Sequence, residues 1–301
     1  MRKTGLFLGG LLAVVLAVSA ARCGSSPISP GSPPVTPPGP TAPAVLVGAG
    51  DIGLCGSAAV AATAALIDNV PGIVFTTGDN AYPNGTAADF RNCYAPHWGR
   101  HRARTRPVPG NHEYHTPGAA DYFAYFEDNA GPPGTGYYMY YAGPWRVFAL
   151  NSEIPIGPGS SQLQWLRSEL SRVATPCTMA YWHKPLFTSG PNGPNREIRE
   201  LWRLLHEFNV DLIVTGHDHL YERFAPQDAD GRADASRGIR QITVGTGGGG
   251  LYTPITSAAN TEAIGIGHGV LQLTLAEGLY QWRFLPIPGN TFVDSGMASC
   301  H

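Results

Sequence analysis

Short apolar runs recur along the chain after residue 43, and amphipathic stretches separate the earlier ones. Runs rich in Val, Ile, Leu, Phe and Thr predict strands over residues 44–49, 72–77, 136–141, 145–150, 178–182, 211–215, 239–244, 269–275 and 280–285. Apolar side chains three or four residues apart predict helices over 57–69, within 89–104, from residue 160 or 161 through Leu170, and over 195–208. Ser57 and either Ser160 or Ser161 are expected to cap two of these helices.

The order of the predicted elements indicates the fold class. Strands and helices alternate in the first part of the chain, whereas antiparallel strands dominate the last part. This order predicts an α/β fold in which two mixed β-sheets pack face to face as a sandwich with flanking helices. The length remaining after residue 43 suits one large domain, so we expect a catalytic domain over residues 44–301.

The first 43 residues differ from the rest in composition. Arg2 and Lys3 precede an apolar run from Gly5 to Ala20 that ends in small residues, which is typical of a secretory signal peptide over residues 1–21. The run is short for a transmembrane anchor, which is the alternative. Residues 22–43 are rich in Pro and Ser and are expected to form an extended linker, either a spacer or a tail with no role.

The five cysteines agree with export, because disulfides persist in oxidising compartments. Cys23 directly follows the apolar run, where bacterial lipoproteins carry their lipid, but Arg22 occupies a position that usually holds a small residue. We therefore expect a secreted or cell-envelope protein and leave open whether Cys23 is lipidated. A lipid at this position is the one membrane contact that we consider.

The charge distribution bears on the choice of partner. Charged residues make up 14% of the chain, the formal net charge is −2, and the sequence has no basic block. Nucleic acid is not expected as an obligatory partner, because binding to a phosphate backbone needs clustered Lys and Arg. The sequence does not indicate the oligomeric state.

Five short motifs place potential metal ligands directly after stretches rich in Val, Ile, Phe or Thr. In chain order they are Gly50–Gly53 (GDIG), Gly78–Tyr82 (GDNAY), Gly110–Glu113 (GNHE), Trp182–Pro185 (WHKP) and Gly216–Arg223 (GHDHLYER). The ends of strands are where an α/β fold gathers a site. Hard oxygen donors and imidazoles repeated in this way predict a centre that holds two metal ions and performs hydrolysis.

The order of these motifs resembles the calcineurin-like metallophosphoesterase superfamily and, within it, the purple acid phosphatase-like branch. The resemblance runs from about Val45 to the C-terminus, and it is similar to the small bacterial type that has the catalytic domain only. It implies the sandwich fold and the two-metal centre. It carries little information about the natural substrate.

Tyr82 is the most diagnostic residue of the resemblance. Most metallophosphoesterases have Asp-x-His in the first motif, but this chain has Gly53 where the His is expected. Tyr82 stands where the purple branch supplies a tyrosinate, which ionises readily only on a strongly acidic cation because its free pKa is near ~10. The resemblance therefore implies Fe(III) at a first site whose ligands are Asp51, Asp79, Tyr82 and His219.

The second site implied by the resemblance shares the carboxylate of Asp79, which bridges the two ions. Its other ligands are Asn111, His183 and His217, and its metal is divalent: Zn, Fe or Mn. His112 is not needed as a ligand. In the family the matching His orients the substrate and acts as the catalytic acid, and the alternative for His112 is an indirect hydrogen-bonding role.

Several neighbouring residues allow more than one role. We expect Glu113 or Asp218 to favour the protonated form of His112. Arg223 could bind a phosphoryl oxygen, but a structural pair with a carboxylate is the preferred hypothesis. The glycine run at residues 245–250 lacks the ending of a phosphate-binding loop and is expected to form a flexible loop at the rim of the cleft.

The function expected from these features is phosphoric ester hydrolysis, in the manner of an acid phosphatase. A metal-bound hydroxide is expected to attack the phosphorus of a small phosphate monoester directly, while His112 protonates the leaving group. The alternatives are a phosphodiesterase or nucleotidase with the same centre, and a surface binding protein that has lost catalysis. The sequence does not indicate the pH optimum.

The four cysteines of the expected domain allow three disulfide pairings. Cys55 follows the first motif and Cys93 the second, so both lie near one sheet edge if those two strands are neighbours. This favours the pairs Cys55–Cys93 and Cys177–Cys300. Free buried thiols are the alternative.

Overall fold

The computed structural model describes residues 1–2, 42–172 and 177–301. Apart from residues 1–2, the predicted signal peptide lies outside the described residues, as do most of the predicted linker and Cys23. Within the described part of the chain, no helix is both long enough and apolar enough to cross a membrane.

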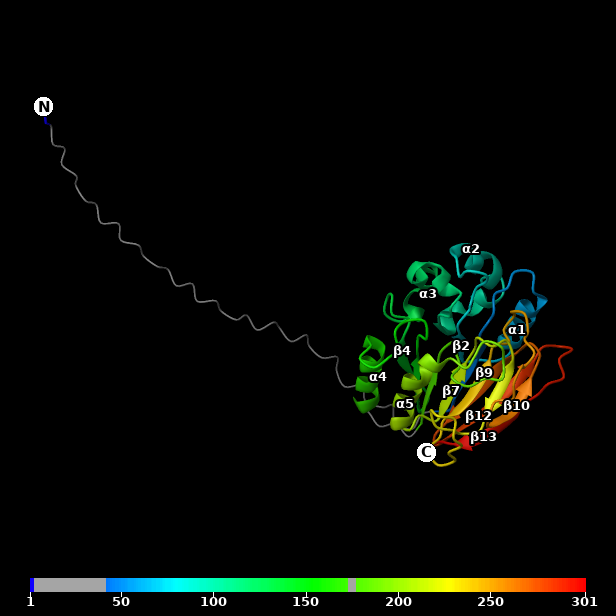
Figure 1. The fold of residues 1–301 in the computed structure, drawn as a ribbon. Coiled ribbons are helices and arrows are strands. Elements are labelled where there is room, and N and C mark those ends of the chain that lie inside the picture. The colour runs from blue at the N-terminus through cyan, green and yellow to red at the C-terminus, as the bar shows by residue number, and fades with distance from the viewer. Residues whose placement is uncertain (3–41, 173–176) are drawn as a thin grey trace. The chain divides into compact units, whose positions relative to one another are not determined.

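Two mixed β-sheets form the frame of the fold (Figure 1). In the first sheet the strand order is β13 (Ser295–Ser299), β12 (Leu279–Pro286), β11 (Gly269–Ala276), β1 (Ala44–Ala49), β2 (Ile73–Thr77) and β3 (Thr105–Val108). In the second sheet it is β10 (Thr261–Gly265), β8 (Tyr221–Phe224), β9 (Arg240–Val244), β7 (Leu212–Thr215), β6 (Thr178–Tyr181), β5 (Trp145–Ala149) and β4 (Tyr138–Ala142). The predicted fold class is confirmed.

The alternation of side chains along the second sheet explains the layers. On β6, Met179 and Tyr181 join the hydrophobic core between the two sheets, whereas Ala180 and the next residue after the strand, Trp182, join a second core beneath helices α4 (Ser161–Arg172) and α5 (Arg199–Glu207). Successive residues of a strand point to opposite faces, so this sheet is buried on both sides. Figure 1 shows α4 and α5 on one side of the sheets.

The remaining helices lie near the first sheet. Helix α1 (Ala58–Asp68) packs on the first sheet and buries Val60, Ala64 and Ile67, which lie on one face of the helix as predicted. The predicted helical segment at 89–104 is broken into α2 (Ala87–Asp89), a π-helical turn (Phe90–Tyr94) and a 3-10 helix (Trp98–Arg104). Helix α3 (Ala120–Phe126), which the sequence pattern did not predict, follows them, with 3-10 turns at Glu113–His115, Pro117–Ala119 and Glu127–Ala130 around it.

The predicted helix at 195–208 is shorter than expected. It consists of a 3-10 turn (Arg196–Ile198) followed by α5. Phe208, the last residue of the predicted helix, lies just beyond α5 and is half-buried. The strands β3, β8, β10 and β13 were not predicted. They lie beside neighbouring strands at or near the sheet edges, where pairing rather than a strong apolar pattern defines them.

The predicted cap of α1 by Ser57 is wrong. Its side chain makes no hydrogen bond to the helix N-terminus and instead donates to the carbonyl oxygen of Gly248 at 2.8 Å. A serine hydroxyl bonds to whichever backbone acceptor the tertiary fold brings closest. Ser57 therefore connects the start of α1 to the glycine run at residues 245–250.

Two disulfides join distant parts of the chain. They are Cys55–Cys93 and Cys177–Cys300, with Cα atoms 4.6 and 5.4 Å apart. Both pairs match the predicted pairing. The first ties the loop after β1 to the π-helical turn, because β1 and β2 are indeed parallel neighbours. The second holds the C-terminal end of the chain to the start of β6.

Candidate metal centre

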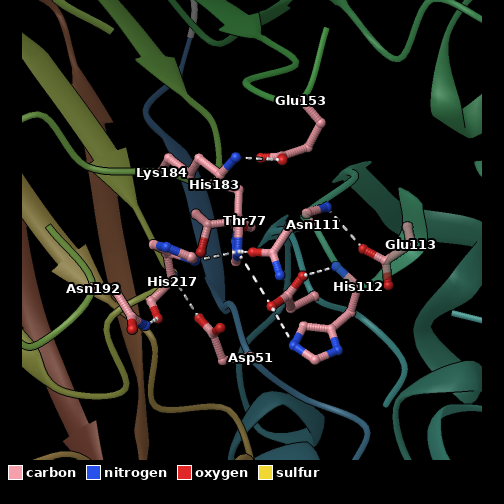
Figure 2. Close-up of polar contacts among 12 residues, drawn as sticks. Asp51, Thr77, Asn111, His112, Glu113, Glu153, His183, Lys184, Asn192 and His217 are labelled. Carbon is pink, nitrogen blue, oxygen red and sulfur yellow. Dashed lines mark hydrogen bonds and ion pairs between the residues drawn. The ribbon is translucent and has the colours of Figure 1, made fainter. Parts of the chain in front are cut away.

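Five strands from both sheets end at one place in the molecule. Sheet neighbours β1, β2 and β3 lead to Asp51, Asp79 and Asn111, and the parallel neighbours β6 and β7 of the other sheet lead to His183 and His217. The carboxyl ends of parallel strands share an edge, so the two sheets each contribute ligands to the gap between them. Figure 2 shows His183 in the middle of this group, with Asn111 and His217 on either side.

Backbone conformation brings the ligand loops this close. Asp51, Asp79 and His217 have positive φ angles of 60°, 48° and 70°. Such angles are uncommon outside glycine and mark places where the chain is held in a special turn. A side chain at Gly110 would meet Asp79 Oδ1 at 2.3 Å, so glycine is required for the close approach of the second and third motifs.

The first ligand cluster surrounds the hydroxyl of Tyr82. This oxygen lies 3.0 Å from Asp51 Oδ1, 3.2 Å from Asp79 Oδ2 and 3.0 Å from His219 Nε2. His219 Nε2 is also 3.1 Å from Asp51 Oδ1. Ligand atoms around a cation at ~2.0–2.3 Å stand ~3 Å apart, so these four groups fit one metal ion.

Gly53 explains why a tyrosine is present in this cluster. Its N–H donates to the carbonyl of Asn80, and a Cβ at position 53 would lie 2.6 Å from that oxygen. A histidine at this position therefore has no room. Tyr82 reaches the same cluster from the neighbouring loop, and its side chain is 6% exposed.

The second ligand cluster surrounds Nε2 of His183. This atom lies 3.2 Å from Asp79 Oδ2, 3.1 Å from Asn111 Oδ1 and 3.1 Å from His217 Nδ1. Ligand atoms of Asp79, His183 and His217 all lie within 4.8 Å of one another, which suits a shared cation. Asp79 Oδ2 takes part in both clusters and is the atom that could bridge two ions.

Backbone carbonyls orient two of the imidazoles. His183 Nδ1 lies 2.8 Å from the carbonyl oxygen of Thr77, and His219 Nδ1 makes a short contact with the carbonyl oxygen of Gly250. A carbonyl only accepts, so each Nδ1 carries the proton and each Nε2 is free to face its cluster. This arrangement is the one that metal-binding histidines require.

Burial and the charges in the centre shift the pKa values of neighbouring groups in opposite directions. Burial lowers the pKa of His183, but the charge of Asp79, the hydrogen bond to it and the charges of Asp51 and Glu153 together outweigh burial and raise that pKa to about 10. For His217, burial and the nearby His183 lower the pKa to about 3. Burial and the carboxylate of Asp51 raise the pKa of Tyr82 well above its usual value. A tyrosinate here therefore needs a strong cation as its partner, and a cation at His183 must displace a proton.

His112 lies beside the clusters rather than within one. Its main-chain N–H donates to Asp79 Oδ1 at 2.9 Å. In the ring, Nδ1 contacts the carbonyl oxygen of Pro83, and Nε2 is 3.7 Å from Asp79 Oδ2. The side chain is 28% exposed. Because Nδ1 is the donor to Pro83, Nε2 is the atom that faces the centre and could carry an exchangeable proton.

The expected partners of His112 are not where the sequence suggested. Buried Glu113 accepts from the N–H groups of Gly110 and Ala81 at 2.8 and 3.1 Å, and burial, followed by the charge of Asp79, raises its pKa to about 8. Asp218 accepts from the hydroxyl of Thr188. Both carboxylates therefore hold loops together, and neither contacts His112.

Arg223 and the glycine run also have structural positions. Arg223 pairs with Asp294 at 2.7 Å and with Glu262, so the preferred structural hypothesis holds. The glycine run was expected at the rim of the cleft, but residues 245–249 are buried. The N–H groups of Gly247 and Gly249 donate to the carbonyls of Gly50 and Asp51, so the run packs against the first motif.

Sequence reasoning missed the contacts that carry no side-chain signature. The carbonyls of Thr77 and Gly250 orient ligands, but any residue has a carbonyl. Lys184 pairs with buried Glu153 at 2.7 Å next to His183, as Figure 2 shows, and both residues were overlooked. The WHKP motif was a signal for Lys184, but nothing in the sequence pointed to Glu153 as its partner.

Comparisons with known proteins agree with this geometry. A family model described as Calcineurin-like phosphoesterase matches residues 46–221. Purple acid phosphatase 15 of Arabidopsis thaliana is 29% identical over 196 residues, which cover 52% of this chain and 37% of that protein. The chain thus spans less than half the length of the plant relatives it matches.

Solved structures show the same fold at low identity. A purple acid phosphatase from yellow lupin (Lupinus luteus) seeds has a TM-score of 0.69 at 19% identity, over 86% of this chain and 54% of that one. GAP50, the anchor in the inner membrane complex of Plasmodium, has a TM-score of 0.63 at 13% identity, over 86% and 89% of the two chains. With the family match covering more than half of its residues, the chain belongs to the calcineurin-like phosphoesterase family and has purple acid phosphatases among its homologues.

Proposed function

We propose that this protein is a dinuclear-metal phosphohydrolase that acts on small phosphate monoesters. The observation that carries the proposal is the position of the Tyr82 hydroxyl, within 3.2 Å of oxygen or nitrogen atoms of Asp51, Asp79 and His219. Acid phosphatases of Arabidopsis thaliana and Aspergillus ficuum are among the similar proteins, which supports this activity. Seven potential ligand side chains meet at one place, which a binding protein without catalysis would not need to keep.

The metal assignment follows the chemistry of the two donor sets. The first set contains two carboxylates, one imidazole and a phenol, and it suits Fe(III), because a phenolate needs a strongly acidic cation. The second set contains the shared Asp79, the neutral amide of Asn111 and two imidazoles, and it suits Zn(II), Fe(II) or Mn(II). When bound, such a pair of ions supplies a water-derived nucleophile and stabilises the charge that develops on the phosphoryl group.

His112 is the residue that we assign to the leaving group. Its Nδ1–H donates to Pro83, so the ring is fixed and Nε2 faces the centre. When protonated at Nε2, it can donate a proton to the departing alkoxide or phenoxide oxygen. Asp79, which belongs to both clusters, also accepts the main-chain N–H of His112. This bond fixes the position of His112 relative to the two ligand clusters.

A comparison of two esters with the same leaving group tests the proposal. The metal-loaded protein should hydrolyse p-nitrophenyl phosphate with a higher kcat/KM than bis-p-nitrophenyl phosphate. The reverse order would assign the centre to a phosphodiesterase. Stoichiometric metal without turnover of either ester would support the binding protein instead.

We also propose an extracytoplasmic location. The disulfides Cys55–Cys93 and Cys177–Cys300 support it, because such bonds persist in oxidising compartments. Alkylation of the protein taken from culture medium and from the cell envelope tests this proposal. Four reactive thiols in the native protein would contradict it.

A further inference from the structure

One side chain outside the five motifs lies flat on a proposed metal ligand. The ring of Tyr252 stacks on the imidazole of His219, with centroids 4.2 Å apart and an angle of 5° between the planes. The N–H of Tyr252 also donates to the carbonyl oxygen of His219 at 2.9 Å. Tyr252 is half-buried, and it is thus bound to both the ring and the backbone of His219.

The Nδ1 edge of the same imidazole contacts the glycine run. His219 Nδ1 donates to the carbonyl oxygen of Gly250. A side chain at Gly249 would lie 2.9 Å from His219 Cε1, so the run can approach the ring only because it has no side chain there. The ring is consequently restrained on one face by Tyr252 and at its Nδ1 edge by Gly250.

A second histidine secures the position of that glycine run. His268, the residue just before β11, donates from Nε2 to the carbonyl oxygen of Gly249 at 2.9 Å. The N–H of Gly249 donates to the main-chain carbonyl oxygen of Asp51 at 2.7 Å. The carbonyl of His268 accepts from the side chain of Asn290 at 3.1 Å, which fixes His268 in turn. Because the run carries the acceptor for His219, holding Gly249 also holds the orientation of that imidazole.

We propose that Tyr252 and His268 are positioning residues for His219, and that they set how tightly the first metal ion is held. This inference rests on the proposed metal centre, and it adds two residues that lie outside the ligand set. A ligand held in one tautomer and one ring orientation loses less entropy on binding a cation. Loss of such a supporting contact typically weakens metal affinity by ~10–100-fold.

The test uses the protein loaded with Fe(III) and Zn(II), so that the two sites carry different elements. Each variant is dialysed against a graded series of chelator, and the retained iron and zinc are measured by mass spectrometry. Tyr252→Leu, which removes the stacked ring, and His268→Ala, which removes the donor, should each lose iron at ~10–100-fold lower chelator concentration than the wild type. Zinc retention should be unchanged.

Two conservative variants serve as matched controls. Tyr252→Phe keeps the stacked ring and His268→Gln keeps a side-chain donor, so both should retain iron more tightly than Tyr252→Leu and His268→Ala. Wild-type iron retention in the Leu and Ala variants would overturn the inference. Equal loss of iron and zinc would also overturn it, because that result indicates general loosening. A wild type that binds fewer than two metal ions would instead contradict the proposed function, on which the inference rests.

Discussion

The main-chain N–H of Tyr82 donates to the carbonyl oxygen of Gly53 at 3.0 Å, and this bond joins the loop after β1 to the loop after β2. The same pairing appears as a bridge between Gly53 and Ala81. The absence of a side chain at Gly53 and the position of the Tyr82 phenol therefore depend on the same contact between the two loops. Backbone contact at Gly53 brings Tyr82 to Asp51 and His219.

Gly53→Ala should destabilise the protein, because the added Cβ would lie 2.6 Å from the carbonyl oxygen of Asn80. We expect a loss of ~1–3 kcal/mol in the free energy of unfolding, the usual cost of overpacking. Denaturant unfolding measures it. Gly157→Ala is the control, because a Cβ at Gly157 meets nothing within 4 Å. Equal stability of Gly53→Ala and the control would show that the loop has room for a side chain.

Asp79→Asn should reduce the binding of both metal ions, because Asp79 Oδ2 faces Tyr82 in one cluster and His183 in the other. The amide offers one neutral oxygen where a charged bridging oxygen is needed. Metal content by mass spectrometry should fall from two ions to one or none, and hydrolysis should be essentially lost. Two retained ions would show that Asp79 does not bridge them.

His112→Ala should keep both metal ions and lose ~10²–10⁴ in turnover, the usual contribution of a placed proton donor. The loss should shrink for leaving groups of low pKa, since these depart without a proton. A series of substituted phenyl phosphates, read as kcat against leaving-group pKa, checks this dependence. If the variant instead loses metal, His112 supports the ligands and is not the acid.

Asp294 gives a prediction about stability and pH. Its carboxylate accepts from Tyr221 at 2.6 Å, from Arg223 at 2.7 Å and from Trp282 at 3.0 Å. Burial raises its pKa, but the hydrogen bonds from Arg223 and Tyr221 outweigh burial and lower it below the usual value. The folded protein thus binds the proton less readily than the unfolded chain, so this stabilisation is present above pH ~4 and is lost as the pH falls through the folded pKa.

Asp294→Asn should therefore lower the free energy of unfolding by ~1–3 kcal/mol at pH 7, since it removes one of the two charged partners of Arg223. The difference from the wild type should narrow as the pH falls below ~4. Urea unfolding at several pH values measures both effects, with Asp128→Asn on the exposed surface as the control. A difference that stays constant down to pH ~2 would contradict the role given to the charge of Asp294.

The sequence could predict the parts of the fold that have a strong local signal. Apolar runs indicated β1, β2, β6 and β7, and four of the five motifs follow directly from the ends of these strands, so the proposed ligands lie together. Strand β13 was missed, because the sequence SGMAS has little apolar alternation and pairing with β12 defines it. Likewise, Ser57 was expected to accept from the first N–H groups of α1, but its hydroxyl instead donates to the carbonyl of Gly248, which is distant in the chain.

The contacts around the ligands could not be predicted, for a different reason. The carbonyls of Thr77 and Gly250 orient His183 and His219, and a carbonyl has no residue signature. Tyr252 and His268 are separated from His219 by long stretches of chain, and only the tertiary fold brings them to it. The burial of Glu113 was equally invisible in the sequence, and so were the bonds that its carboxylate accepts from the N–H groups of Gly110 and Ala81.

The visible absorption spectrum of the iron-loaded protein, measured beside that of Tyr82→Phe, tests the central claim most directly. We predict a coloured wild type, because a tyrosinate bound to Fe(III) transfers charge to the metal, and a Tyr82→Phe variant that has lost this band. Tyr137→Phe, whose ring packs on Trp165 in α4, should keep the colour of the wild type. A wild type that contains Fe(III) at the centre and is colourless would contradict the assignment of Tyr82 as a ligand.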